Sequence, residues 1–262
     1  MAITEADRMR ALMRIPEMEI LLEPVFERSL RKVIAETMKA NGLGPINNLT
    51  AARAQREPTP DGLRILFTAW QREVDKTITP AMLAAFRKAA AFTLGRLPGD
   101  LPAVFGPNVR DVRAASWFAR IRNRLVGVGQ TAYEEATDAL RTSLEMGEGT
   151  AKAAERVRES LGVTLRRATT IARTEAAAAV NGADASISAE LAAADLPHRV
   201  EWMATEDHRT RVTHADADGQ QIEPGQKFQV GGASLAYPGD PEGPPGEVIN
   251  CRCTTILDLD DE

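Results

Sequence analysis

Two cysteines near the C-terminal end of the sequence are the residues best suited to chemistry. Cys251 and Cys253 are the only 2 cysteines of the chain, and one residue separates them. Thiolate and imidazole are zinc ligands, so the cysteines with His214, and with His208 or Asp207 as a fourth ligand, form a candidate metal site. On a strand, residues two apart face the same way but lie about 7 Å apart at their α-carbons, whereas structural zinc sites use Cys-x2-4-Cys turns. A strained local disulfide and two buried structural thiols are therefore the alternatives, and we expect no other cofactor.

A polar segment, residues 201–219, holds the second candidate group. Asp207 is placed as the N-cap of a short helix, on which Arg211 and His214 lie three apart and share a face. In one interpretation these side chains and Arg209 converge on an anion site or a catalytic cluster. In the other, the helix is simply capped and the arginines tie loops together through backbone carbonyls.

Sequence motifs of common enzymes are otherwise absent. The chain has no G-x-x-x-x-G-K-[ST], G-x-S-x-G, H-E-x-x-H or strand-linked G-x-G-x-x-G motif, and only 3 histidines are available for acid and base catalysis. A metal-dependent phosphodiesterase or nuclease is the enzymatic alternative. It would use four residues of the polar segment: Asp207, His214, Asp216 and Asp218.

Helices must position these groups, because Ala, Leu, Arg and Glu dominate residues 1–195. Apolar residues recur there at intervals of three and four, which is one face of an α-helix. In residues 1–40 this face consists of Leu12, Ile15, Leu22, Phe26, Leu30, Val33, Ile34 and Met38. We expect Pro16 and Pro24 to start or kink turns and the turn formers at residues 41–48 to end the first helix.

Further helices are expected before the cysteine-containing region. They are Gly62–Lys76, Pro80–Thr93, Val109–Met146, Thr150–Leu161 and the Ala-rich segment 164–194. Gly127 and Gly129 could bend or split the longest of them. After Leu196 the composition changes, since six Pro and seven Gly fall between Pro197 and Asn250.

The change in composition predicts a domain boundary and an α+β fold, with a mainly helical N-terminal body and a small loop-rich α+β C-terminal module. Runs that favour strands occur at Arg199–Met203, Lys227–Val230 and Val248–Leu257. We assign residues 1–163 to the helical body and residues 164–262 to the module. Within the module, residues 164–194 form a connecting helix and residues 197–258 the small α+β part.

Two surfaces are candidates for contact with a partner. The Pro-rich loop Leu235–Gly246 has few backbone donors and little freedom when unfolded, so it is either a shaped docking surface or an ordinary connector. The segment Arg110–Arg124 carries five arginines near Trp117 and Phe118, and it is either a solvated helix face or a surface for DNA or an acidic partner.

Composition and charge indicate a globular protein with neither a membrane span nor a general affinity for nucleic acid. Hydrophobic residues make up 44% and charged residues 26% of the chain, as in globular proteins, and its net charge is −5. Residues 1–150 carry a net charge of +3 and the remainder −8, so DNA binding must be local. The sequence contains no apolar run that predicts a membrane span, we expect no secretory signal, and the two cysteines favour a reduced compartment.

An ordered set of short motifs occupies residues 165–258. The most specific are A-R-T-E at 172–175, D-x-R-T-R-x-x-H at 207–214 and N-C-R-C at 250–253. Other positions of the set are Asn181, Glu201-Trp202, Asp218-Gly219, Pro224, Phe228 and Tyr237-Pro238-Gly239-Asp240-Pro241. In this order they resemble the phage head morphogenesis family, also called Mu F-like minor head proteins.

The resemblance implies a structural virion protein and not an enzyme. Its implied partners are the portal protein and the major capsid protein, with packaged DNA contacted through the Arg110–Arg124 segment, and no membrane. The implied location is the capsid interior or portal vertex after assembly in the host cytoplasm, where the protein assists head assembly or DNA delivery. Some relatives carry a toxin or nuclease domain after the module, and we expect no such activity here because few residues follow the last expected strand.

The resemblance also implies a set of structural residues. The motif positions fall on Arg173, Glu175, Asn181, Asp207, Arg209, Arg211, His214, Asn250, Cys251 and Cys253. We interpret them as one polar core that docks the Ala-rich helix onto the small module. Thr174 and Asn181 share one helix face, so Asn181 is expected to bind loop backbone while Glu175 pairs with an arginine. A nucleic-acid-binding adaptor that uses the Arg110–Arg124 segment is a third hypothesis, beside the head protein and the nuclease.

Overall fold

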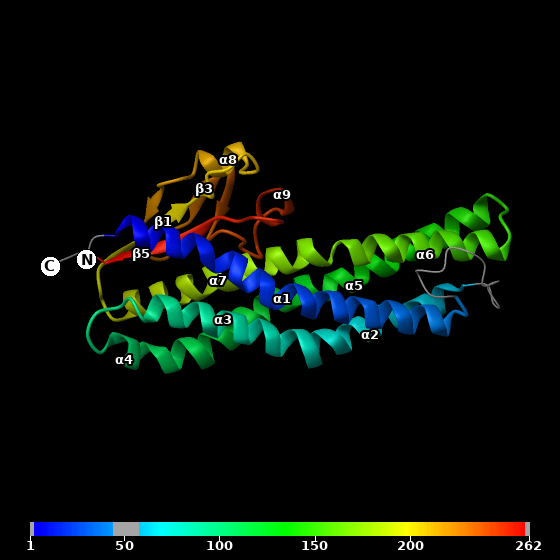
Figure 1. The fold of residues 1–262 in the computed structure, drawn as a ribbon, viewed down its shortest axis with the longest axis horizontal. Helices are drawn as coiled ribbons and strands as arrows, with labels where there is room; N and C mark the ends of the chain where they lie inside the picture. Colours follow the sequence, from blue (N-terminus) through cyan, green and yellow to red (C-terminus); the bar gives the residue numbers. More distant parts are fainter. Residues whose placement is uncertain (1–2, 44–57, 260–262) are drawn as a thin grey trace. The chain divides into compact units, whose positions relative to one another are not determined.

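The structure of the chain, a computed structural model, describes residues 3–43 and 58–259. In these residues a mainly helical N-terminal body precedes small antiparallel sheets, so the expected α+β class is confirmed (Figure 1). Every helix of the described ranges is too short or too polar to cross a membrane. The turn formers at 41–48 lie partly outside these ranges, and α1 ends just before them.

Within residues 3–43 and 58–259, six α-helices form the body, and two of them are preceded by a π-helical turn. They are α1 (Glu5–Ala40), α2 (Pro60–Glu73), α3 (Thr79–Leu94), α4 (Leu101–Asn108), α5 (Ala114–Glu145) and α6 (Thr150–Arg166), with the turns η1 (Val74–Ile78) before α3 and η2 (Val109–Arg113) before α5. α1 continues through Pro16 and Pro24 as one helix, and α5 is not split at Gly127 and Gly129. The buried apolar face outweighs the local cost of these residues.

The remaining elements belong to the C-terminal part. They are α7 (Ala168–Ala193), β1 (His198–Met203), α8 (Val212–Ala215), β2 (Gln221–Ile222), β3 (Phe228–Val230), β4 (Ala233–Leu235), α9 (Pro245–Val248) and β5 (Thr254–Leu259). β1 is central in an antiparallel sheet of order β2-β1-β5, with Trp202 opposite Thr255. β3 and β4 form a separate hairpin whose turn, Gly231 and Gly232, has φ of 56° and 80°. Positive φ at both positions suits the twist of a two-residue hairpin and favours glycine.

The chain forms two compact units that each combine distant segments. One contains Met1–Glu23, Ala81–Arg120 and Thr170–Glu262, and the other Pro24–Pro80 and Ile121–Thr169. Both draw on residues before and after 163, the last residue assigned to the helical body. That residues 164–262 form a domain of their own stays a prediction.

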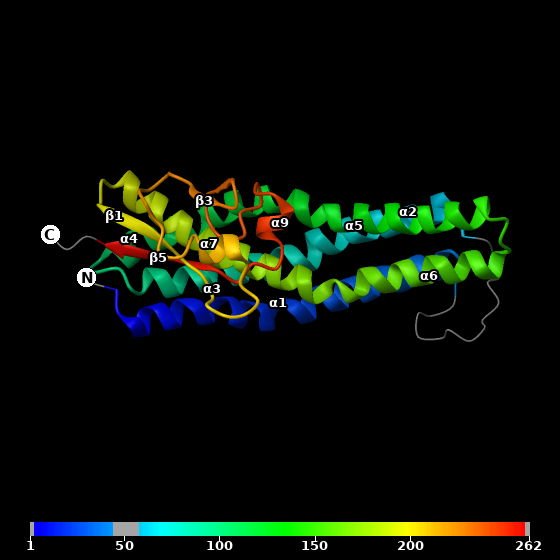
Figure 2. The same cartoon turned by 90° about the horizontal axis from the view of Figure 1, so that it is seen from above.

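The unit that contains the sheets has an apolar cluster beneath them. Trp202 of β1 is fully buried and meets Phe228 of β3 edge to face, with 5.4 Å between the ring centroids. Cys251 and Cys253 are buried in the same cluster. On the other side of the sheet, Ile256 of β5 packs with Ala11 of α1. The small sheet is therefore anchored on both faces, with α1 and α7 lying along it (Figures 1 and 2).

In the same unit, α7 is packed closely against α5 at a glycine. A Cβ at Gly182 would lie 2.3 Å from Nε1 of Trp117, which is itself buried and 4.9 Å from the ring of Phe86. Gly182 weakens an otherwise strong helix former, and the close approach of the indole explains its presence.

The second unit is helical. Its helices α2, α6 and the adjoining parts of α1 and α5 run side by side in both ribbon views (Figures 1 and 2). Trp70 of α2 is fully buried and donates its indole N–H to the carbonyl of Leu125, with a distance of 2.6 Å. Gly129 provides the space for this ring, since a Cβ there would lie 2.6 Å from it.

Candidate functional site

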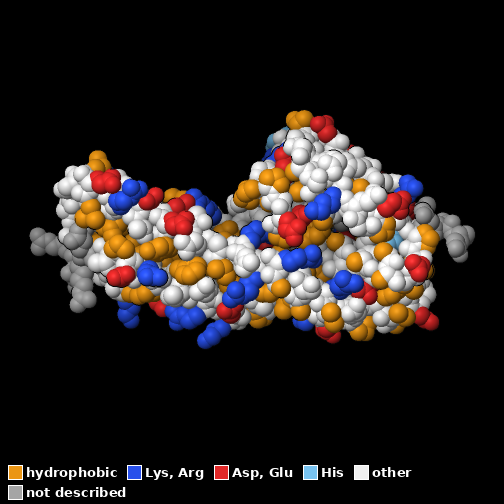
Figure 3. Space-filling view, turned by 180° about the vertical axis from the view of Figure 1, so that it is seen from behind, with side chains coloured by type: hydrophobic (Ala, Val, Ile, Leu, Met, Phe, Trp, Pro, Cys, Tyr) orange, Lys and Arg blue, Asp and Glu red, His pale blue; other side chains and the backbone are white. Residues whose placement is uncertain are grey.

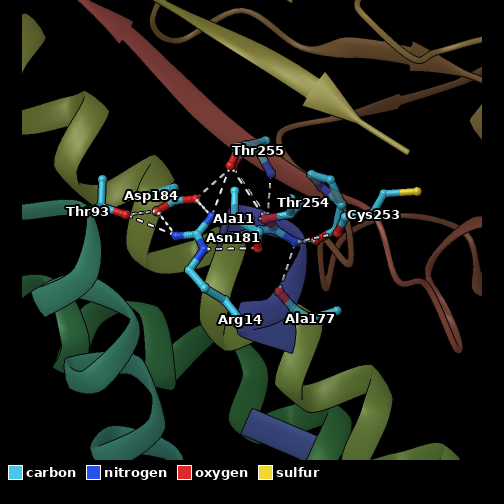
Figure 4. A network of polar contacts seen from close by, with 10 residues as sticks. Ala11, Arg14, Thr93, Ala177, Asn181, Asp184, Cys253, Thr254 and Thr255 are labelled. Carbon is cyan, nitrogen blue, oxygen red and sulfur yellow. Dashed lines mark hydrogen bonds and ion pairs between the residues drawn. The ribbon is translucent and has the colours of Figure 1, made fainter. Parts of the chain in front are cut away.

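A buried ion pair joins the N-terminal helix to α7 and β5 (Figure 4). Arg14 of α1 donates from its two terminal nitrogens to the two carboxylate oxygens of Asp184, at 2.8 and 2.7 Å. The same guanidinium donates to the hydroxyl of Thr254 and the carbonyl of Thr255, each at 3.0 Å. Thr93 of α3 donates its hydroxyl to Asp184 at 2.6 Å. These contacts fix three helices against the last strand.

Asn181, one turn before Asp184, binds three backbone groups outside α7. Its amide nitrogen donates to the carbonyls of Pro238 and Cys253, at 3.0 and 3.1 Å, and its oxygen accepts the N–H of Thr255 at 2.9 Å. Asn181 therefore binds loop backbone, as its position on the helix face suggests. It also holds the Pro-rich loop, in which residues 237–240 are buried and most of residues 241–247 are exposed.

The first turns of α7 hold the chain just before the cysteines. Arg173 forms a two-point ion pair with Glu19 and donates to the side-chain oxygen of Asn250 at 2.9 Å. The hydroxyl of Thr174 accepts the backbone N–H of Asn250 at 3.0 Å. Asn250 has a φ of 62°, a left-handed conformation that Asn tolerates better than most residues. α7 thus fixes a sharp turn at this position.

The turn at Asn250 corrects the expected strand Val248–Leu257. Val248 ends α9, residues 249–253 are irregular, and β5 begins only at Thr254. Cys251 and Cys253 therefore do not lie on a flat strand, and the separation of their side chains expected from strand geometry does not apply. Among the described residues, His214, Cys251 and Cys253 are the one group of three or more His, Cys, Asp or Glu side chains that could hold a metal, with all ligand atoms within 4.8 Å of one another.

The imidazole of His214 faces both thiols. Its Nδ1 lies 3.3 Å from Sγ of Cys253 and 3.7 Å from Sγ of Cys251. Its Nε2 lies 3.0 Å from a carboxylate oxygen of Glu247. A hydrogen bond between the two thiols and burial raise the pKa of Cys253, while the same hydrogen bond lowers the pKa of Cys251. Burial also keeps all three side chains from solvent, at 1–2% exposure.

Asp207 is not the N-cap that the sequence suggests. The helix that follows, α8, begins only at Val212 with Arg211 as its capping position. Asp207 instead accepts two hydrogen bonds from Arg252, at 2.5 and 2.6 Å, and one from the backbone N–H of Arg209. These bonds hold the pKa of Asp207 well below its usual range. The ion pair wins over the cap because a carboxylate accepts two bonds from one guanidinium.

The four residues of the expected anion site or catalytic cluster, Asp207, Arg209, Arg211 and His214, do not converge on one site. Arg211 donates to the carbonyl of Ile249 at 2.5 Å, and Asp207 and His214 have the separate partners described above. This arrangement matches the interpretation in which an arginine ties loops together. Arg209 and His208 are exposed, and neither His208 nor Asp207 joins the cysteines as a fourth metal ligand.

The residue set of the nuclease alternative is also dispersed. Asp218 accepts the backbone N–H of Ala204 at 2.7 Å, and Asp207 pairs with Arg252. Within the described ranges, Asp207, Asp216 and Asp218 do not join His214 in a metal-binding group. Glu175 is buried in α7, and its pairing with an arginine stays a prediction.

The arginines of segment 110–124 are partly engaged within the chain. Arg113 pairs with Glu190 at 2.5 Å, and Arg122 pairs with Asp75 at 2.9 Å. Arg110 donates to the carbonyl of Gly106, and Arg120 is exposed. Basic and acidic side chains are intermixed on the face of the molecule drawn in Figure 3. The segment therefore offers scattered positive charge.

Sequence reasoning missed several residues of this site, among them Arg14, Asp184 and Glu247. Arg14 and Asp184 are 170 positions apart, and no local pattern connects them. Asp184 did give a signal, because a carboxylate inside an Ala-rich helix is a poor helix former and asks for a partner. Glu247 lies in the Pro-rich region and became significant only through its contact with His214.

Comparisons with known proteins match the region that contains α7, His214 and the two cysteines. Residues 134–256 match the family described as "Phage Mu protein F like protein". The match begins inside α5, earlier than the motif set at 165–258, and it contains α7, the cysteines and their partners of the C-terminal part. No solved structure gives a significant match.

Two curated relatives share this region. The NAD(+)–arginine ADP-ribosyltransferase EFV of Enterococcus faecalis is 30% identical over 141 residues, which are 54% of this chain and 29% of that protein. Minor head protein GP7 of Bacillus phage SPP1 is 35% identical over 126 residues, which are 47% of this chain and 40% of that protein. The chain thus spans well under half of either relative. Residues 134–256 thus match a phage Mu protein F-like domain, and the chain is homologous to a phage minor head protein over 126 residues.

Proposed function

We propose that the chain is a structural minor head protein of a tailed phage or phage-like particle. It associates with the portal or the inner capsid and assists head assembly or DNA delivery. The observation that carries the proposal is the match of residues 134–256 to the Mu F-like family, together with similarity to a minor head protein over 126 residues. Its location in this proposal is the capsid interior or the portal vertex, after assembly in the host cytoplasm.

The contacts that the motif residues make within the chain support a structural role. Arg173, Asn181 and Asn250 are engaged with one another or with backbone of the C-terminal part. Asp207 is engaged with Arg252, and Arg211 with the carbonyl of Ile249. Residues that satisfy each other in this way hold loops in a fixed shape, which suits a protein that presents a surface to assembly partners.

Portal protein and major capsid protein are the partners in this proposal, and packaged DNA is a third through Arg110–Arg124. The acidic C-terminal part repels phosphate, so a DNA contact falls to exposed basic residues of the body such as Arg120. Arg120→Glu is expected to weaken retention on DNA at low salt, because it reverses one charge on that segment. Arg64→Glu, an exposed arginine of α2, makes the same charge change elsewhere and serves as the control.

Head assembly with and without the chain tests the proposal. The cognate portal and major capsid proteins are produced together, once with the full chain and once without it, and the particles are isolated. We expect the chain to co-purify with portal rings or heads, and its omission to reduce the yield of correctly sized or DNA-filled heads. Full yield without the chain, combined with no binding to portal or capsid protein, contradicts the proposal.

An enzymatic role is the second candidate, and the transferase named above is the observation that favours it. The same preparation is assayed for NAD+ consumption with arginine-containing acceptors, and for DNA cleavage with Mg2+, Mn2+ or Zn2+. We expect neither activity. Consumption of NAD+ would replace the structural proposal by the enzymatic one. DNA cleavage that His214→Ala abolishes would do the same.

A further inference from the structure

We propose that His214, Cys251 and Cys253 bind one zinc ion, which fastens the turn between α9 and β5 to α8. The inference concerns a metal site and does not depend on the role of the protein in heads. The three ligand atoms are Nδ1 of the histidine and the two Sγ atoms. Cys251 and Cys253 follow His214 by 37 and 39 positions in the sequence.

The distances between these atoms agree with a tetrahedral ion. Zinc lies about 2.3 Å from sulfur and about 2.0–2.1 Å from nitrogen, so a tetrahedral angle places sulfur and nitrogen about 3.6 Å apart. The observed separations from Nδ1 are 3.3 Å for Cys253 and 3.7 Å for Cys251. Small movements of the side chains therefore suffice to form the site.

The surroundings of His214 suit coordination through Nδ1. Nε2 lies 3.0 Å from a carboxylate oxygen of Glu247, which also accepts a hydrogen bond from the hydroxyl of Thr213 at 2.9 Å. With its proton on Nε2, the imidazole presents the lone pair of Nδ1 to the thiols. A carboxylate that orients a histidine in this way is the usual outer partner of a zinc ligand.

Charge and burial favour a doubly charged ion at this position. Two thiolates and Zn2+ sum to zero charge, so the site can occupy an apolar cluster without a buried net charge. That cluster contains Trp202 and Phe228, and the indole meets the imidazole edge to face at 5.6 Å. The ligands are nearly inaccessible to solvent, and three protein ligands leave the fourth position of a tetrahedral ion to a neutral water molecule.

Zinc content and local structure test the site on the full chain, purified without a histidine tag. We expect a zinc content of one ion per chain, measured by inductively coupled plasma mass spectrometry. X-ray absorption at the zinc edge is expected to show sulfur scatterers at about 2.3 Å and nitrogen at about 2.0–2.1 Å. Cobalt added to the metal-free protein is expected to give thiolate charge-transfer absorption and the strong visible bands of a tetrahedral ion. These readouts need no variant.

Variants then assign the ligands. Cys251→Ser and His214→Gln are expected to abolish the cobalt thiolate spectrum or strip it of one ligand, while Glu247→Gln keeps the spectrum and weakens metal affinity about 10–100-fold. His208→Gln is the matched control, because this exposed histidine lies in the same segment and outside the metal group.

Three outcomes overturn the proposal. One is background zinc in the wild type together with no thiolate band on cobalt addition. The second is a zinc edge spectrum with only nitrogen and oxygen scatterers. The third is an intact mass, under non-reducing conditions, that lacks two hydrogens, because a Cys251–Cys253 disulfide removes the metal ligands.

Discussion

Removal of the carboxylate at Asp184 is expected to cost the protein a large part of its stability. The side chains of Arg14 and Asp184 are 6% and 1% exposed, and the carboxylate accepts four hydrogen bonds, two of them from the guanidinium. Asp184→Ala leaves that guanidinium buried without a counter-charge. Loss of one member of such a pair lowers the free energy of unfolding by about 3–5 kcal/mol.

Two further variants separate charge from shape. Asp184→Asn keeps the size of the side chain and one carbonyl oxygen but also removes the counter-charge, so it is expected to cost about as much as Asp184→Ala, about 3–5 kcal/mol. The double variant Arg14→Met with Asp184→Leu removes both charges and replaces them with apolar groups. It is expected to recover most of the loss of Asp184→Ala, because the uncompensated charge causes that loss.

Denaturation by urea, followed by circular dichroism, measures these changes, and amide hydrogen exchange locates them in the unit that contains β5. Asp138→Ala is the control, since that carboxylate lies on α5, is 70% exposed and pairs with Arg141. It is expected to change the free energy of unfolding by less than about 1 kcal/mol. If Asp184→Ala costs no more than this control at the same denaturant slope, the reasoning about the buried pair is wrong.

Three other predictions follow from the site and its supports. Gly182→Ala is expected to lower the free energy of unfolding by about 1–3 kcal/mol, because its Cβ meets Trp117, whereas Gly127→Ala, with open space around it, gains up to about 1 kcal/mol. Thermal melts that rank these two variants the other way contradict the packing. Asn250→Ala is expected to be less stable than Asn250→Gly by about 1–2 kcal/mol, since both lose the amide but only glycine accepts a φ of 62° freely. Equal denaturation midpoints would refute this. The pKa of Asp207 is lowered in the folded state, so its ion pair stabilises the protein above the usual value of 3.8 and is lost as the pH falls below it. The stability difference between wild type and Asp207→Asn should therefore be constant from neutral pH to about 5 and shrink toward zero in acid, and a difference that grows there opposes the assignment.

Periodicity was sufficient to predict the helical body. The expected apolar positions of residues 1–40 are buried along one face of α1 from Ile15 to Met38, and Leu12 is partly buried, as the three-and-four spacing suggests. The change in composition after Leu196 also marks the start of the sheets, and the first strand lies within a residue of its expected start. Local pattern and burial agree in these segments, so single-sequence reasoning succeeds there.

Boundaries in the C-terminal part depended on contacts that local sequence does not contain. The run after Val248 favours a strand, but Thr174 and Arg173 hold Asn250 in a left-handed turn and delay the strand to Thr254. Asp207 has the composition of an N-cap, yet Arg252 offers it two hydrogen bonds. In both cases a partner many positions away overrides a local preference.

The link between Arg14 and the strand at Thr254 has a consequence for the order in which the molecule is made. A ribosome releases α1 long before β5 exists, so the guanidinium of Arg14 must remain hydrated or hold provisional partners during most of synthesis. The sequence separation of 240 positions also makes closure of this contact a late and slow event. The nascent chain can acquire helices early, while completion of this unit waits for its final strand.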